Sequence, residues 1–342
     1  MVDLRPSEEQ RELVASFANL LSKASSPERV RAAEPLGFDE ALWRTLVDTG
    51  AVTMGVPEAS GGWGATLLDL ALVAELVGRA AAPAPVLETQ VASRLLATVG
   101  ADDALAPVLE GEQLVTLALR PPVDGVAALL PAGAVCDAVV VLDGDDLRLV
   151  PVADADRTVV GNLAGAPVAD VRLGDGTVLA SGADAVERFE VALDEWLALT
   201  AAALVGLGGA ALDLGCAYAV ERKAFGQAIG SFQGIAHPLA DDATNLDGAR
   251  LLAQKAAWTL DTGGSRGREL AAMAFSFAAR AAEKATYDAL HTHGGYGFML
   301  EYDVQLHWRR VRGWARLWGD AEAGDDRAGA ARYGSLRYGK GH

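Results

Sequence analysis

The chain has 342 residues, of which 51% are hydrophobic and 22% are charged. This composition is typical of a globular protein with a large core, and the length corresponds to about two domains. The 46 acidic residues outnumber the 29 basic residues, which gives a formal net charge of −17. Such a charge repels phosphate groups and anionic lipids, so nucleic-acid and membrane-surface binding are excluded as the main function.

The two cysteines, Cys136 and Cys216, lie far apart and lack CxxC spacing. This excludes a disulfide framework and a cysteine-rich metal site, and it is typical of a cytoplasmic protein. Residues 1–10 show neither the apolar core of a signal peptide nor an Arg- and Ser-rich transit sequence. The uncharged run Trp196–Leu212 is closely bordered by acidic residues, which favours a buried core helix over a membrane span. We therefore predict a cytoplasmic protein without a metal site.

Residues 1–112 are predicted to form an N-terminal helical domain. Ser7 and Gln10 have the spacing of a helix capping box, and apolar residues at helical spacing follow them. The same periodicity predicts three further helices, over Asp39–Asp48, Leu67–Arg79 and Val86–Leu96. The glycine-rich segment Gly50–Gly64 lies between helices rather than after a strand, so it is predicted to be a loop without a dinucleotide-binding role.

Residues 113–192 are predicted to form a small, shortened antiparallel β domain. The β-branched runs Ala138–Leu142 and Leu147–Val152 are separated by an Asp-Gly-Asp-Asp turn, which is typical of a hairpin. Gly174–Gly176 predicts a second turn, between the short apolar segments Asp170–Leu173 and Thr177–Leu179.

Residues 193–320 are predicted to form a four-helix bundle, and residues 321–342 a loosely held tail. Helical periodicity is found over Asp194–Arg222, Ile235–Leu260, Arg266–Leu290 and Val304–Trp318. Helices, a small sheet and a bundle therefore follow one another without the strand–helix alternation of a Rossmann fold. The predicted fold class is mainly α with a small central β domain.

Two glycine-containing segments interrupt the bundle, Arg222–Gln233 and His291–Phe298. Glycine lets the backbone approach a ligand closely because it has no Cβ. Arg222 offers a planar donor fork suited to a pyrophosphate, Phe225 an apolar ring, and Gln233 both a donor and an acceptor. Taken singly, these are ordinary features of helix ends and loops. Together they indicate a site for a large, anionic, aromatic cofactor.

In this order, the segments resemble the acyl-CoA dehydrogenase family over nearly the whole chain. Arg222–Gln233 matches that family's Arg-x-x-Phe-Gly-x-x-x-x-x-Phe-Gln signature, and His293–Phe298 matches its second glycine signature. Val56–Gly64 and Leu68–Gly78 resemble its helical domain. The resemblance implies a flavoprotein with a helical domain, a β domain and a four-helix bundle. It also implies a dimer of dimers, in which both signatures serve the FAD of a neighbouring subunit.

Carried over to this chain, the resemblance assigns six residues to the cofactor. Arg222, Phe225 and Gln233 would hold the pyrophosphate and adenosine side of FAD. The backbone of three glycines would pass close to its adenine end, namely Gly294, Gly295 and Gly297.

The family also requires a carboxylate that takes the α-proton of an acyl thioester while FAD takes the β-hydride. At the two positions where the family carries this base, the chain has Trp318 and Trp196. Glu195 and Asp320 are the nearby acids, but a one-residue shift on a helix rotates a side chain by about 100°. No residue of this chain is therefore assigned a catalytic role.

The central segment also lacks the loop and the tryptophan-containing strand that cover the flavin ring in the family. The chain thus resembles the smaller, base-lacking subunit of the α2β2 acyl-CoA dehydrogenases of actinobacterial steroid degradation. This resemblance implies a larger partner subunit that supplies the base and most of the acyl-CoA site, FAD shared with that partner, and an electron-transfer flavoprotein or a similar acceptor. Two alternatives stay open: a self-sufficient dehydrogenase that uses Glu195 or Asp320, and a cofactor-free structural or regulatory relative.

Overall fold

The computed structural model describes residues 4–334 of the chain. Its N-terminal part is a block of helices, α1 (Glu8–Ala24), α2 (Pro27–Ala32), α3 (Glu40–Asp48), α4 (Leu67–Arg79), α5 (Val86–Thr98) and α6 (Asp102–Leu109). The predicted capping box at Ser7 and Gln10 is confirmed, because each side chain bonds to the other residue's backbone N–H. A short 3-10 turn, Glu58–Ser60, is the only helical segment within the predicted loop at 50–64.

The central part is formed by two small sheets, whose strands are β1 (Val115–Leu117), β2 (Val126–Leu130), β3 (Ala138–Asp143), β4 (Asp146–Pro151), β5 (Arg157–Val159), β6 (Ala169–Arg172) and β7 (Thr177–Ser181). One sheet has the order β1-β3-β4-β7 and the other β2-β6-β5. The predicted β3–β4 hairpin is confirmed. The expectation of a wholly antiparallel domain is wrong, because β1 pairs with β3 in parallel. The strands on either side of Gly174–Gly176, β6 and β7, belong to different sheets.

The C-terminal part contains five long helices within the described residues, α7 (Gly182–Glu221), α8 (Gln233–Asp261), α9 (Gly267–Thr292), α10 (Val304–Trp314) and α11 (Ala321–Tyr333). The four predicted helices are present, but α7 begins at Gly182, well inside the segment expected to belong to the β domain. The expected loose tail is wrong as far as Tyr333, because α11 packs against α9. The rest of that tail lies outside the described residues, and the domain boundaries at 113 and 193 stay predictions.

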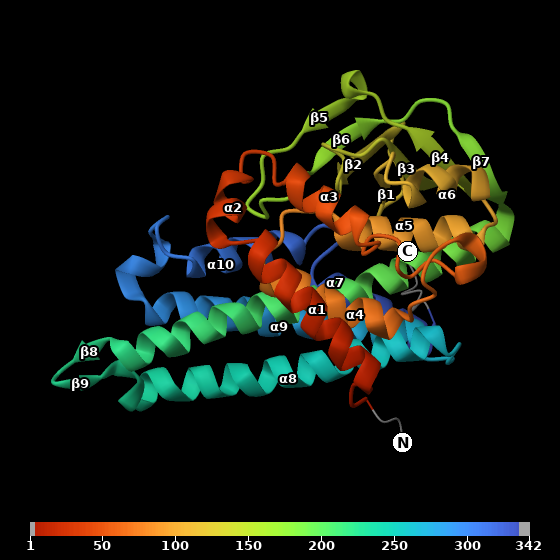
Figure 1. Ribbon diagram of the computed structural model, residues 1–342. Coiled ribbons are helices and arrows are strands. Elements are labelled where there is room, and N and C mark those ends of the chain that lie inside the picture. Colours follow the sequence, from red (N-terminus) through yellow and green to blue (C-terminus); the bar gives the residue numbers. More distant parts are fainter. Residues whose placement is uncertain (1–3, 335–342) are drawn as a thin grey trace, which may run out of the picture.

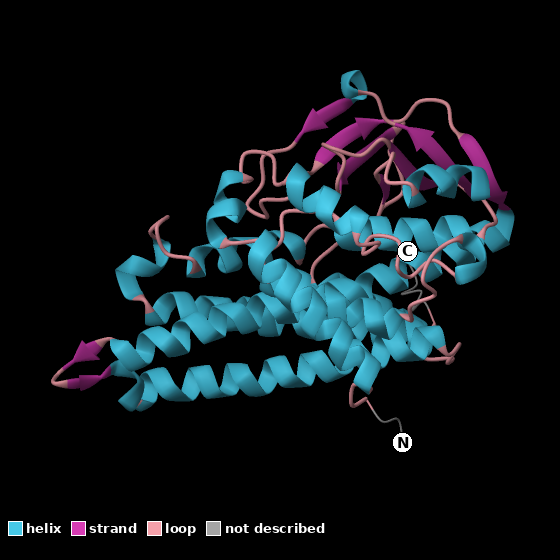
Figure 2. Cartoon of the chain, viewed as in Figure 1, coloured by secondary structure: helices cyan, strands magenta, loops and turns pink. Residues whose placement is uncertain are grey.

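Helix α7 is the centre of the molecule, between the N-terminal helices and the rest of the bundle (Figure 1). Gly78 of α4 and Gly206 of α7 make the close contact of these two helices possible, since a Cβ on either would lie 1.9 Å from a carbonyl oxygen of the other helix. The two sheets formed by β1–β7 lie over one side of the helical part, and α8 runs along the opposite side (Figures 1 and 2). By length and composition α7 could cross a membrane, but 78% of its most apolar window is buried inside the protein.

A buried carboxylate between α8 and α9 leads to a prediction about pH. Burial and the nearby Asp288 raise the pKa of Asp242 to about 6, against the opposing influence of Lys284 at 3.1 Å. A carboxyl whose pKa is raised in the folded state costs stability once it ionises, so this cost grows as pH rises toward 6 and is complete above it. Asp242→Asn is therefore expected to stabilise the protein more at pH 7.5 than at pH 5. Urea denaturation at the two pH values measures this, with exposed Asp241→Asn as the control; equal effects of Asp242→Asn at both values would contradict it.

Candidate functional site

The first glycine-containing segment forms a tip at the end of the bundle. After α7 ends, Lys223–Ala224 (β8) pairs antiparallel with Gln227–Ala228 (β9). This small hairpin projects beyond the ends of α7 and α8, away from the central strands (Figure 1). At its turn, Phe225 and Gly226 both have left-handed backbone angles, with φ of +53° and +84°. Glycine adopts this conformation freely, whereas it is strained for phenylalanine and is maintained most often at functional sites.

The side chains at the tip are available to a ligand or a partner. Phe225 is 97% exposed, with its ring edge-on to Phe232. Arg222 and Gln233 are exposed, and within residues 4–334 neither side chain makes a hydrogen bond or ion pair. An arginine without a carboxylate partner is noteworthy in a chain with a net charge of −17. A guanidinium fork, an amide and an outward aromatic ring therefore lie on one short segment, as the sequence predicts.

The second segment follows α9 as a 3-10 turn, Gly294–Phe298. Gly294 has φ +60°, and an added Cβ at Gly294 or Gly295 would meet nothing within 4 Å, so the backbone is open on that side. Gly297 differs, because it is buried and its Cβ would lie 2.4 Å from the carbonyl oxygen of Leu290. The chain's own packing thus requires Gly297 to be glycine, whether or not a ligand is present.

Aromatic stacking joins the last turn of α7, just before the first segment, to the second segment. Tyr218, one turn before the end of α7, stacks on His293, with ring centroids 4.3 Å apart. His293 also lies edge-on to Tyr302, and Tyr302 stacks on Tyr296 of the second turn. Large apolar side chains are exposed around these rings, among them Val220, Phe298 and Leu300. This end of the protein therefore combines open backbone, an unpaired cation and uncovered apolar surface.

The two usual base positions lie away from the tip, Trp196 in the first half of α7 and Trp318 between α10 and α11. Trp196 is fully buried and packs on Phe275, with ring centroids 6.3 Å apart. Trp318 packs edge-on against the same phenylalanine at 5.8 Å. The two positions thus converge in space, but an aromatic cluster occupies the place of a carboxylate. Trp196 Nε1 donates a hydrogen bond to Glu88 Oε1 at 3.3 Å.

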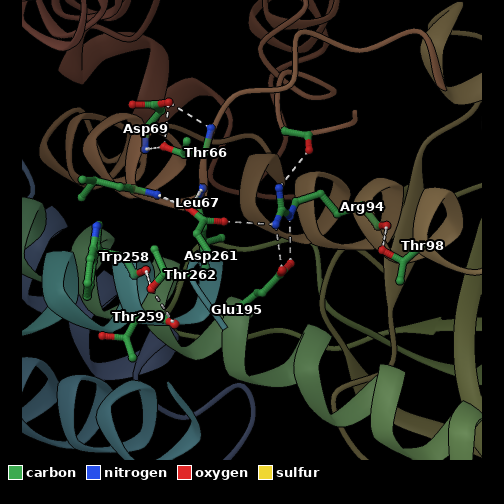
Figure 3. A network of polar contacts seen from close by, with 12 residues as sticks. Thr66, Leu67, Asp69, Arg94, Thr98, Glu195, Trp258, Thr259, Asp261 and Thr262 are labelled. Carbon is green, nitrogen blue, oxygen red and sulfur yellow. Dashed lines mark hydrogen bonds and ion pairs between the residues drawn. The ribbon is translucent and has the colours of Figure 1, made fainter. Parts of the chain in front are cut away.

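The two alternative acids are both engaged in structural contacts. Glu195 accepts two hydrogen bonds from Arg94, at 3.0 and 2.9 Å (Figure 3). Arg94 also donates to the carbonyl oxygen of Gly55, and its Nη2 lies 3.6 Å from Oδ1 of Asp261. Glu195 therefore belongs to a network that joins α7 to α5 and α8. Asp320 is the N-cap of α11 and accepts from two backbone N–H groups of its first turn. Neither carboxylate faces Trp196 as a free base.

A cavity that sequence patterns did not indicate lies beside Trp196, between the N-terminal block, the strands and the bundle. Its volume is about 40 Å³, far below the roughly 300–1,000 Å³ of pockets that bind cofactors or drug-sized ligands. Burial raises the pKa of Glu88, which lines it. Other lining residues are Thr200, Arg310 and Trp314. A flavin ring or an acyl chain does not fit this space.

The chain belongs to the acyl-CoA dehydrogenase family. Residues 7–111 match the model of the acyl-CoA dehydrogenase N-terminal domain, and residues 187–323 match that of the C-terminal domain. The fold class expected from the sequence, mainly α with a small central β part, is confirmed.

Among its relatives is the acyl-CoA dehydrogenase IpdE2 of Mycolicibacterium smegmatis, 33% identical over 324 residues that cover 92% of this chain and 95% of IpdE2. A chain of the ChsE4–ChsE5 complex from Mycobacterium tuberculosis has a similar structure, with a TM-score of 0.87, 25% identity and coverage of 96% and 98% of the two chains. A chain of the Tcur3481–Tcur3483 steroid acyl-CoA dehydrogenase, in its G363A variant, is also similar, with a TM-score of 0.84 and 25% identity. The match covers 95% of this chain and 98% of that chain.

Proposed function

We propose that this chain is the non-catalytic subunit of a heteromeric, flavin-dependent acyl-CoA dehydrogenase. It would contribute its tip to an FAD whose ring lies in a homologous, larger partner subunit. The observation that carries the proposal is the contrast between two places along α7. At its C-terminal end, Arg222 and Phe225 are exposed, and the Arg222 side chain has no hydrogen bond or ion pair within residues 4–334. In its first half, Trp196 fills the place of the base beside a cavity too small for a flavin.

The residues at the tip each have a role in this proposal. Arg222 would pair its guanidinium with the pyrophosphate, because a planar fork matches phosphate oxygens and stays charged at neutral pH. Phe225 would cover an apolar face of the cofactor, and Gln233 would bond to polar atoms on the adenosine side. Gly294 and Gly295 would let the adenine lie against the backbone, while Gly297 maintains the shape of the turn.

The partner would supply what this chain lacks. When bound, FAD takes the β-hydride of the acyl thioester, and the partner's carboxylate takes the α-proton. The names of two similar structures support a heteromeric arrangement, since one is the ChsE4–ChsE5 complex and the other, Tcur3481–Tcur3483, is named with two proteins and described as a steroid enzyme. We accordingly propose an α2β2 enzyme of the cytoplasm that desaturates a bulky, steroid-derived acyl-CoA. By the family's analogy it would pass electrons to an electron-transfer flavoprotein or a similar acceptor.

The two other functions weighed from the sequence have less support. A self-sufficient dehydrogenase needs a free base, and Glu195 and Asp320 are bound to Arg94 and to the backbone of α11. A cofactor-free structural relative does not account for the exposed Arg222 or for the strained, outward Phe225.

Arg222→Ala tests the shared cofactor site. Co-expression of the chain with its larger partner is expected to give about one FAD per heterodimer. Loss of a charge-assisted pair with the pyrophosphate should weaken FAD binding about 10- to 100-fold. Flavin absorbance per heterodimer after dialysis measures the loss, and the exposed Arg44→Ala on α3 is the control.

Two results would contradict the proposal. If Arg222→Ala leaves the FAD content unchanged, the tip does not hold the cofactor and the cofactor-free alternative gains support. If the chain alone forms a yellow homotetramer that oxidises an acyl-CoA, the self-sufficient enzyme is correct.

A further inference from the structure

The cavity beside Trp196 contains a buried cation without an anion. Arg310 of α10 is only 2% exposed. Its Nη1 donates to the carbonyl oxygens of Ala164 and Gly165, at 3.2 and 2.8 Å, but its Nε and Nη2 are buried and have no partner. In the part of the chain that the structure describes, no carboxylate forms an ion pair with it.

In the described part of the chain, none of the ionisable groups around Arg310 forms an ion pair with it. Burial lowers the pKa of Arg310 to about 10, so it is still charged at neutral pH. Burial and Arg310 itself lower the pKa of His307 to about 4, so that ring is neutral. The charge of Glu34 opposes the lowering of the pKa of Arg310, but its carboxylate is bonded to Arg309. Glu88, on the same cavity, has a raised pKa because it is buried. A buried charge without a directly paired counter-charge is unfavourable, which favours the binding of an anion.

Two further hydrogen-bond donors of the cavity wall have no partner within residues 4–334. Thr200 Oγ1 and Trp314 Nε1 are buried without a hydrogen-bond partner, and both residues line the cavity with Arg310. Thr200 of α7 and Arg310 and Trp314 of α10 thus line one space, and Glu88 is the carboxylic acid among the lining residues. The volume of about 40 Å³ corresponds to about three water molecules, which is room for an anion of few atoms.

We propose that this cavity is a binding site for a small monovalent anion, either a carboxylate the size of formate or acetate or a halide. Arg310 supplies the charge, and Thr200 and Trp314 supply hydrogen bonds. By neutralising Arg310, the anion stabilises the place where α10 meets the loop at Ala164–Gly165. The site does not depend on the tip or on FAD, so its presence and the proposed function are tested separately.

The test uses the full chain, together with its partner subunit where the two copurify. Formate and chloride are titrated at constant ionic strength while the fluorescence of the cavity tryptophans and the thermal midpoint are followed. Binding should saturate for one or both anions, and benzoate, which is too large, should have no effect. Comparing formate with chloride distinguishes the carboxylate from the halide. Crystals soaked in bromide should show anomalous density within hydrogen-bond distance of Arg310.

Three variants connect the signal to the cavity. Thr200→Val removes one donor without changing the shape of the side chain and should raise the dissociation constant about tenfold. Arg310→Gln can still donate to a loop carbonyl but has no charge, and should abolish binding. Thr286→Val, the same change at a buried threonine of α9 that bonds within its own helix, should leave the affinity unchanged.

The following outcomes would overturn the proposal. Ordered water instead of bromide at Arg310 would show that water satisfies the donors. A bromide peak without saturable binding in solution would mean an adventitious ion only. Equal affinities in Thr200→Val and the unmodified protein would place the observed binding elsewhere, and this comparison holds even if Arg310→Gln fails to fold.

Discussion

Trp196→Glu is expected to destabilise the protein by about 4 kcal/mol or more and not to create a dehydrogenase. The substitution restores a carboxylate at one of the family's base positions, but Trp196 is fully buried against Phe275 and its indole bonds to Glu88. A glutamate there would lose the ring packing and face a second carboxyl, and two close carboxyls do not both ionise. Thermal or urea denaturation gives the loss of stability, and anaerobic flavin bleaching by an acyl-CoA gives the activity.

Trp196→Phe is the matched control for that experiment. It keeps an aromatic ring against Phe275 and removes only the indole N–H and some volume, so it should cost about 1–2 kcal/mol. A Trp196→Glu chain as stable as the unmodified one, which bleaches flavin without its partner, would show that the site is an enzyme centre lacking only a base. The proposed division of labour would then be wrong.

Asp194→Ala is expected to cost about 3–5 kcal/mol, because it leaves two arginines without their shared carboxylate. Asp194 is buried on α7, and its two oxygens accept from Arg268 of α9 at 2.9 Å and from Arg327 of α11 at 2.6 and 2.9 Å. This carboxylate therefore connects three helices. Urea denaturation measures the loss, and limited proteolysis should show earlier cleavage at α11.

The control for Asp194→Ala is Glu40→Ala, which breaks an exposed pair with Arg44 on α3. Both substitutions remove a carboxylate–arginine pair, but the pair at Glu40 is exposed and the one at Asp194 is buried. Because exposed pairs contribute at most about 1 kcal/mol, Glu40→Ala should cost much less stability. Similar costs for both, or an unchanged rate of cleavage at α11, would mean that α11 is held by its packing on α9 and not by the buried ion cluster.

Local signals in the sequence predict most of the fold. The observed α4 has the predicted bounds because Thr66 and Asp69 form a capping box at its start and apolar residues follow at helical spacing. The β3–β4 hairpin was predictable from its turn and its β-branched strands. Helix α11 was not, because Gly324 and Ala328, which it buries, are small residues without an apolar periodicity.

The pairing of distant strands carries no local signal. The structure is needed to show that β1 runs parallel to β3 and that β6 and β7 belong to different sheets. The early start of α7 was missed for another reason: its first turns contain several acids and small residues, which are equally typical of a loop.

The candidate site likewise has one part that could be predicted from the sequence and one part that could not. The tip was predictable because glycine spacing, an arginine and an aromatic residue form a signature along the sequence. The cavity was not, since Arg310 and its neighbour Arg309 look like an exposed basic pair. One signal was present: Leu306, Arg310 and Trp314 recur every four residues and so share a helix face, which places the arginine on the buried side.

The length of α7 separates Trp196 from Arg222 by about 40 Å, at about 1.5 Å per residue. No bending within one chain brings the tip of a continuous helix back to its own cavity, so each tip acts only on a neighbour. Under the proposed function, a pair of unlike chains then contains one working reaction centre rather than two. Selection would act on the tip and on the cavity wall independently, because the tip must match a partner's cofactor, whereas the cavity wall must keep the packing and the proposed anion site of its own chain. Substitutions at Trp196 and at Arg222 should accordingly be additive in their effects on stability.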